Sequence, residues 1–178
     1  STNNSYFNFK EKIITNINQN KISIIAEIKK ASPSAGVIIN DYNPVEIANI
    51  YYKNNSTCLS VLTEEDFFLG KIDHIRQIKE KINLPILCKD FFIDKFQIPL
   101  AKSYGADAIL IILAGVKENL ADELYNEALK YLYKANKEKP FDPDTLNYLG
   151  FANRKIDNIK DAEIYYLMGL EVDPKHNG

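Results

Sequence analysis

Between residues 22 and 113 the sequence alternates short apolar runs with longer amphipathic stretches, and this alternation limits the possible folds. The runs are rich in β-branched residues, are bounded by polar residues, Gly or Pro, and are too short for helices. They occupy residues 22–28, 58–62, 85–88 and 107–113. Nearly continuous apolar runs are typical of strands buried on both faces of a parallel sheet, so we predict four such strands.

The stretches between the runs have helical signals. Asn43 is a favourable N-cap before Pro44 at the first helical position. Apolar residues recur on one helical face over residues 71–82, and Gly105 is suited to end a third helix that begins at Asp94. Strands and helices that alternate through right-handed crossovers form a (βα) barrel or a doubly wound sheet. Neither a GxGxxG nor a Walker A motif is present, which disfavours nucleotide binding.

After residue 113 the alternation stops and only helices are predicted. A long helix ends at a proline-rich break, and two shorter helices follow it. The expected bounds are residues 118–139, 144–155 and 159–172. The alternation therefore predicts an α/β region that ends near residue 113 and an all-α region after it.

The bulk properties exclude several classes of partner. A formal net charge of −2 gives no sign of nucleic-acid binding, and no apolar run approaches the roughly 20 residues of a membrane span. The polar N-terminal stretch lacks a signal-peptide pattern, so a cytoplasmic protein is expected. Cys58 and Cys88 lie in predicted strands without CxxC spacing, and we interpret them as small buried side chains rather than metal ligands or a disulfide.

Charged residues end two of the predicted strands. Glu27 and Lys29 are two residues apart, so they share a strand face with Ile25, whereas Ile24 should face the helices. Lys89 ends the run at residues 85–88. Ligands of parallel α/β folds bind at the carboxyl ends of strands, where these three charges could hold an anion and shift one another's pKa values. A purely structural Glu27–Lys89 ion pair is an equally good interpretation of the spacing.

Five segments resemble indole-3-glycerol phosphate synthases, in the order and spacing of that family. The resemblance lies within residues 8–129 and covers about 110 of the 178 residues. The segments are IIAEIKKASPSAGVI, DYNPVEIANIYYKNN, SVLTEEDFFLG, LPILCKDFFIDKFQI and GADAILIILA. AEIKKASPS, SVLTEEDFF and KDFFID are each fairly specific, and together they favour the synthase over the phosphate-sugar isomerases that share its barrel.

The resemblance implies a (βα)8 barrel that closes and decarboxylates 1-(2-carboxyphenylamino)-1-deoxyribulose 5-phosphate in tryptophan synthesis, without a metal or organic cofactor. Lys89 would then be the general acid that protonates the substrate carbonyl. Glu27 would hold and polarise Lys89, and Lys29 would help to anchor anionic groups of the substrate. The substrate pocket would include Ser32, Phe68 and Phe91.

The family also uses residues from the second half of its barrel: a general-base Glu, an Asn and loops that bind phosphate. After residue 129 this chain instead continues as KYLYKANKEKPFDPDTLNYLGFANRK. The resemblance thus implies half of a (βα)8 barrel over residues 1–129, followed by an all-α segment over residues 130–178. We therefore expect little or no turnover by the chain alone. The sheet edges at residues 22–28 and 107–113 would be open, which predicts a homo-oligomer.

The C-terminal stretch resembles a tetratricopeptide repeat of about 34 residues, counted from Pro143. Small residues are needed where the two helices pack closely, and Asn153 replaces the usual aromatic residue. The matching positions are Leu146, Leu149, Gly150, Ala162, Tyr166, Gly169 and Pro174. An ordinary amphipathic helical hairpin is the alternative interpretation. Three functions remain open: a synthase-like half-barrel, a scaffold that binds a protein partner through the helical segment, and a fusion fragment without function.

Overall fold

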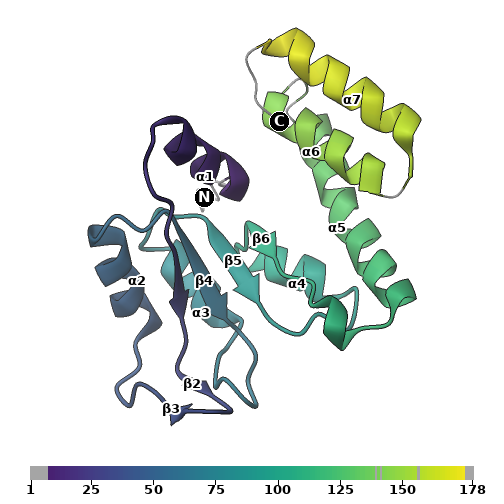
Figure 1. The fold of residues 1–178 in the computed structure, drawn as a ribbon. Coiled ribbons are helices and arrows are strands. Elements are labelled where there is room, and N and C mark those ends of the chain that lie inside the picture. The colour runs from purple at the N-terminus through teal and green to yellow at the C-terminus, as the bar shows by residue number, and fades with distance from the viewer. Residues whose placement is uncertain (1–7, 139, 141, 156, 175–178) are drawn as a thin grey trace. The chain divides into compact units, whose positions relative to one another are not determined.

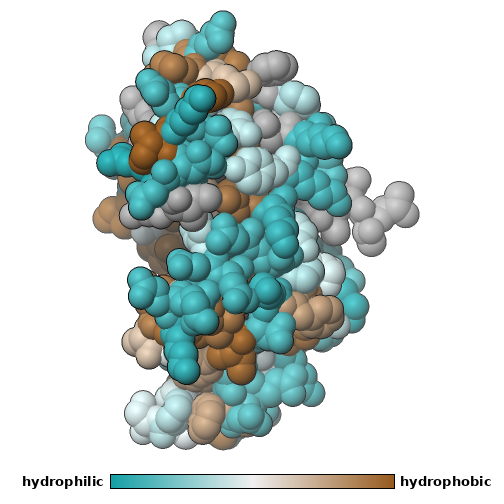
Figure 2. Space-filling view, turned by 90° about the vertical axis from the view of Figure 1, so that its right-hand side faces the viewer, coloured by the Kyte–Doolittle hydropathy of each residue, from teal (hydrophilic) through white to brown (hydrophobic). Residues whose placement is uncertain are grey.

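The computed structural model describes residues 8–138, 140, 142–155 and 157–174. The chain divides into two compact units, Ser1–Glu118 and Asn119–Gly178. Over the described residues, none of the helices combines the length and the apolar character that crossing a bilayer requires. The face drawn in Figure 2 is mostly hydrophilic, with smaller hydrophobic patches between the polar residues.

The first unit contains a parallel four-stranded sheet in the order β1-β4-β5-β6 (Figure 1). Its strands are β1 (Ile25–Ile28), β4 (Cys58–Leu62), β5 (Ile86–Lys89) and β6 (Ala108–Ile109). All five residues of β4 are buried, whereas β1 alternates between buried and exposed positions. The predicted α/β class with four parallel strands is confirmed, and the arrangement is consistent with part of a TIM-type barrel.

A helix follows each of the first three strands of this sheet. These helices are α2 (Pro44–Lys53), α3 (Asp73–Lys79) and α4 (Gln97–Ser103). The Asn43 side chain caps α2 by accepting hydrogen bonds from Val45 N at 3.1 Å and Glu46 N at 3.2 Å. Gly105 follows α4 with a φ of +98°, a conformation that favours glycine after a helix end. The signals at Asn43 and Gly105 therefore act where they were expected, but the expected helix start at Asp94 is wrong, because α4 begins at Gln97.

The core of this unit lies between the sheet and its helices. Its fully buried side chains include Ile28, Leu59, Val61, Ile75, Ile78 and Ile86. The fully buried Asp107 carboxylate binds Lys79 Nζ at 2.5 Å and Ile86 N at 2.8 Å, which ties α3 to the starts of β5 and β6. Burial lowers the pKa of Lys79, although Asp107 opposes this effect.

The structure adds elements that the sequence interpretation did not contain and shortens two strands that it did. The strand expected at residues 22–28 begins only at Ile25. The additions are α1 (Phe9–Asn18) and a hairpin of β2 (Ala31–Ser32) and β3 (Gly36–Val37). The expected strand at residues 107–113 is wrong beyond Ile109, because β6 pairs with β5 through two residues only. A 3₁₀ turn, η1 (Leu113–Gly115), follows.

The described part of the second unit contains three helices. These are α5 (Glu118–Glu138), α6 (Pro143–Lys155) and α7 (Ile159–Val172), which lie within one residue of the expected bounds. Residue 139, the expected end of the first helix, lies outside the described residues, as do the side chain of Pro143 and residue 178 of the predicted segment. Leu129, Leu149 and Ala152 form a buried cluster to which Tyr133 and Tyr165 add partly buried rings.

Asn153 links the three helices of this unit from a fully buried position. Its Oδ1 accepts hydrogen bonds from Tyr133 Oη on α5 and from Asn158 Nδ2 before α7, both at 3.0 Å. Its Nδ2 donates to Leu149 O at 2.8 Å. The amide therefore satisfies its buried polar atoms where the repeat pattern would place an aromatic ring.

Candidate active site

Three charged side chains meet at the carboxyl ends of the strands. Glu27 Oε1 lies 2.8 Å from Lys29 Nζ, and Glu27 Oε2 lies 2.5 Å from Lys89 Nζ. One carboxylate thus bridges two ammonium groups. About a third of each side chain is exposed, with values of 31% for Glu27, 30% for Lys29 and 34% for Lys89. The group is therefore accessible to a ligand.

The order of the strands explains this meeting. β4 lies between β1 and β5, and the sheet register places Ser60 beside Glu27 and Leu62 beside Lys89. The long side chains of Glu27 and Lys89 extend across β4 toward each other. Tyr51 on α2 supports β1 at this point, because its hydroxyl donates a hydrogen bond to Glu27 O at 3.2 Å.

The charges around Glu27 keep it ionised. Burial acts to raise the pKa of Glu27, but hydrogen bonds to Lys29 and Lys89 and the charges of both lysines outweigh burial, so the pKa lies below its usual value. One carboxylate beside two ammonium groups gives this group of three side chains a net positive charge. The arrangement can bind an anionic group and can present an ammonium proton to a bound molecule.

The other residues predicted for the site lie in the segments that follow β1, β4 and β5. Ser32 lies on β2, where its Oγ accepts a hydrogen bond from Ala35 N at 3.2 Å. Phe68 is half-buried, and its carbonyl accepts a hydrogen bond from Ala31 N at 3.2 Å, which connects the loop after β4 to the hairpin after β1. Phe91 follows Lys89 by two residues and is 43% exposed.

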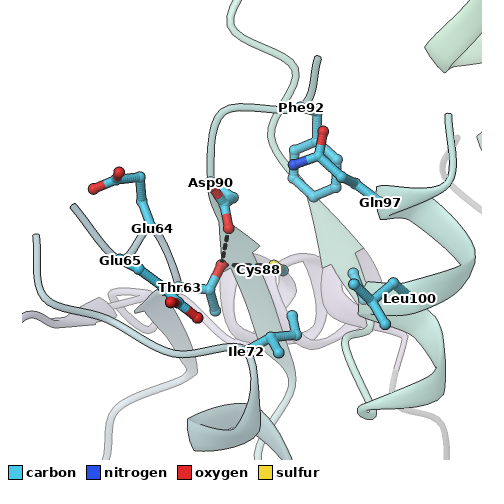
Figure 3. Close-up of a pocket in the computed structure, with 10 residues that line it drawn as sticks. Thr63, Glu64, Glu65, Ile72, Cys88, Asp90, Phe92, Gln97 and Leu100 are labelled. Carbon is cyan, nitrogen blue, oxygen red and sulfur yellow. Dashed lines mark hydrogen bonds between the residues drawn. The ribbon is translucent and has the colours of Figure 1, made fainter. Parts of the chain in front are cut away.

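A cavity of about 240 Å³ opens beside β4 and β5 (Figure 3). Its lining includes Thr63, Cys88, Asp90, Ile72 before α3, and Gln97 and Leu100 of α4. Thr63 Oγ1 donates to Asp90 Oδ2 at 2.5 Å and lies 3.4 Å from Cys88 Sγ. Burial raises the pKa of Cys88 to about 12, so the thiol stays protonated and is a poor nucleophile. The sequence interpretation missed Thr63, Asp90 and Gln97. Thr63 and Asp90 carried a usable signal, because each follows an apolar run by one or two residues.

Residues 1–134 match the family model of indole-3-glycerol phosphate synthase. The chain is 50% identical over 123 residues to the indole-3-glycerol phosphate synthase of Clostridium acetobutylicum, covering 69% of this chain and 45% of that protein. For the synthase of Trichodesmium erythraeum the identity is 47% over 114 residues, covering 64% and 36%. For that of Prochlorococcus marinus it is 40% over 148 residues, covering 79% and 50%. The chain thus spans half or less of the length of these relatives.

Proposed function

The chain belongs to the indole-3-glycerol phosphate synthase family, and on this premise we propose that its first unit carries the acid side of a synthase active site. Lys89 is the general acid that protonates the substrate carbonyl as the ring closes. Glu27 holds and polarises Lys89, and Lys29 anchors an anionic group of the substrate. The observation that supports this proposal is the single carboxylate of Glu27 in contact with both lysines.

The contact geometry suits proton donation. A lysine side chain is long and flexible, so an ammonium group contributes to catalysis only when it is held close to the reacting atom. The 2.5 Å contact with Glu27 holds the Lys89 ammonium, while its 34% exposure leaves it open to a bound molecule. A well-placed general acid contributes a factor of about 10² to 10⁴.

The substrate of this proposal is 1-(2-carboxyphenylamino)-1-deoxyribulose 5-phosphate, the phosphorylated compound on which the family acts. It combines a flat aromatic ring with a carboxylate and a phosphate, which suits cations beside aromatic side chains. Phe68 and Phe91 would line the ring, and Ser32 would complete the pocket wall. Lys29 would meet the carboxylate.

We also propose that the chain alone turns over little or no substrate. The family's base Glu, its Asn and its phosphate loops belong to the second half of the barrel, and the chain spans half or less of the relatives compared above. Loss of phosphate binding removes the remote interactions that position the reacting centre. A lone general acid does not replace them.

The direct test measures formation of indole-3-glycerol phosphate by the purified chain, alone and with a separately produced second half of a relative's barrel. We expect no detectable product from the chain alone and product after complementation. Lys89→Ala should abolish the complemented activity, whereas Lys130→Ala, which removes a lysine that is 70% exposed on α5, should not. A normal synthase rate from the unassisted chain would refute the proposed loss of turnover.

For the helical unit, we propose a tetratricopeptide-like hairpin of α6 and α7 as a second, scaffolding function. The close approach of Gly150 to the Tyr166 ring favours this proposal over an ordinary hairpin, because a Cβ at Gly150 would lie 2.7 Å from Tyr166 Cδ1. Scaffolds of this kind usually need about three repeats to form a binding groove. The synthase-like function therefore remains our first proposal, and the Gly150 variants in the Discussion test the packing of the hairpin.

A further inference from the structure

The loop between β5 and α4 is held by the side chain at its far end. Gln97, the first residue of α4, accepts two hydrogen bonds at Oε1, from Ile93 N at 2.7 Å and Asp94 N at 2.9 Å. Its Nε2 donates to Phe91 O at 2.9 Å. The amide oxygen of Gln97 and one of its N–H groups thus both bond to the backbone of a single loop. In Figure 3, the Gln97 side chain extends from α4 toward the loop that carries Phe92.

Asp90 holds the near end of the same loop. Its Oδ1 accepts a hydrogen bond from Phe91 N at 2.8 Å, and its Oδ2 accepts one from Thr63 Oγ1 at 2.5 Å. Thr63 follows β4 and is only 2% exposed, so it is a rigid anchor. Both backbone polar groups of Phe91 are therefore bound by side chains: Asp90 binds the N–H, and Gln97 on α4 binds the carbonyl.

Phe91 needs such support because burial does not fix its ring. Its side chain is 43% exposed, whereas the neighbouring Phe92 is 2% exposed and lies in the core. An exposed aromatic side chain on a loop moves with its backbone. The position of Phe91 at the strand ends thus depends on the hydrogen bonds of its own peptide groups.

We infer that Gln97 is a positioning residue that fixes Phe91 at the rim beside Lys89, with Asp90 as the second arm of the same clamp. The consequence for the substrate rests on the proposed function, since Phe91 would then line the pocket for the aromatic ring. Gln97 itself acts only through the loop and touches no reacting atom. Its importance comes from the amide group, which accepts two hydrogen bonds and donates a third.

Three variants of the full chain separate the parts of this clamp. Gln97→Leu removes all three hydrogen bonds at similar volume. Gln97→Glu keeps an acceptor for Ile93 N and Asp94 N but cannot donate to Phe91 O. Gln77→Leu is the matched control. Gln77 is exposed on α3, and its Nε2 donates a hydrogen bond to Asp73 Oδ2 within the same helix.

Two measurements are independent of any substrate. Amide hydrogen exchange of Ile93 and Asp94 should accelerate about tenfold in Gln97→Leu, while exchange in β4 stays unchanged. In protein labelled with 4-fluorophenylalanine, the Phe91 signal, one of nine and assigned with Phe91→Leu, should broaden or split in Gln97→Leu. Gln97→Glu should restore slow amide exchange and only part of the Phe91 signal, and Gln77→Leu should match the wild type. A Phe91 signal unchanged in Gln97→Leu would overturn the inference.

Substrate binding separates this inference from the proposed function. The chain contains no Trp, so the anthranilate fluorescence of 1-(2-carboxyphenylamino)-1-deoxyribulose 5-phosphate reports binding directly. We expect Gln97→Leu to raise the Kd about tenfold and Gln77→Leu to leave it unchanged. If the wild type binds the compound neither alone nor after addition of the second half of a relative's barrel, the proposed function fails, while a disturbed Phe91 signal still supports the clamp. If Gln97→Leu binds as tightly as the wild type despite a disturbed loop, the role in positioning is refuted.

Discussion

Lys89 Nζ lies 2.5 Å from Glu27 Oε2, although the two residues come from strands that are separated by the whole width of β4. The contact joins the first and third strands of the sheet at their carboxyl ends. It leaves about a third of each side chain exposed, and Glu27 contacts Lys29 as well. This relationship makes the three charges one electrostatic unit, so a change in one should alter the behaviour of the other two.

The first prediction concerns stability. Lys89→Ala should lower the free energy of unfolding by less than about 1 kcal/mol, because partly exposed ion pairs contribute little after solvent screening. Urea denaturation of both proteins measures the change, and Lys130→Ala provides a control for loss of an exposed helical pair. A loss of several kcal/mol would show that the Glu27–Lys89 pair is a structural element of the core.

The second prediction concerns pH. The pKa of Glu27 is lowered in the folded chain from its usual value of 4.5, so folding favours the ionised carboxylate. Its contribution to stability should therefore be complete above about pH 4.5 and should disappear as the pH falls through the lower folded-state pKa. The difference in unfolding free energy between wild type and Glu27→Gln should be constant near neutral pH and shrink in acid. A difference that grows toward low pH would contradict the assigned direction.

The sequence predicted best the helices that carry capping residues and the strand that is buried on both faces. β4 has the expected bounds because five consecutive apolar or small residues can all be buried in the centre of a sheet. The strand at residues 107–113 was overestimated, because β6 is an edge strand whose length depends on how much of β5 it can pair with. Ile24 was expected to face the helices but is 51% exposed, since it precedes β1.

The charged part of the site followed from strand order, whereas the loop contacts did not. Glu27 and Lys89 could be placed at one edge because parallel strands end on the same side of a sheet. Gln97 could not be identified, because its three hydrogen bonds depend on how the loop between β5 and α4 folds back on the helix. α1 was missed although it carries a local signal: the Asn8 side chain caps it by accepting a hydrogen bond from Glu11 N at 3.0 Å.

The third prediction concerns the packing of the helical unit. A Cβ at Gly150 would lie 2.7 to 2.9 Å from the Tyr166 ring, closer than real atoms approach. Gly150→Ala should therefore lower stability by about 1–3 kcal/mol, and Gly150→Leu should cost more and remove helical signal from this unit. Circular dichroism during thermal unfolding measures both effects.

Tyr166→Leu offers a matched test of the same contact. Because the ring is the group that a new Cβ would meet, Gly150→Ala should cost less in the Tyr166→Leu background than in the wild type. Equal costs in both backgrounds would show that the ring is not the obstacle. If the whole chain unfolds in one step, the helical unit does not unfold independently of the first unit.

The last prediction concerns assembly and follows from the two ends of the sheet order. Within the described residues, β1 and β6 have one strand neighbour each, so both present backbone groups that another strand could pair with. The central strand β4 is buried, but Ile25 on β1 is 47% exposed and Leu110 after β6 is 39% exposed. Exposed apolar side chains at open edges favour pairing between chains, and two copies of a four-stranded sheet supply the eight strands of a closed barrel.

We therefore expect a dimer at tens of micromolar, measured by light scattering coupled to size exclusion. Ile25→Lys should shift the dimer toward monomer, because it places a charge on the edge strand, whereas Ile17→Lys, at a residue that is 60% exposed on α1, should not. A clean monomer at that concentration would mean that the sheet edges are not an interface between copies.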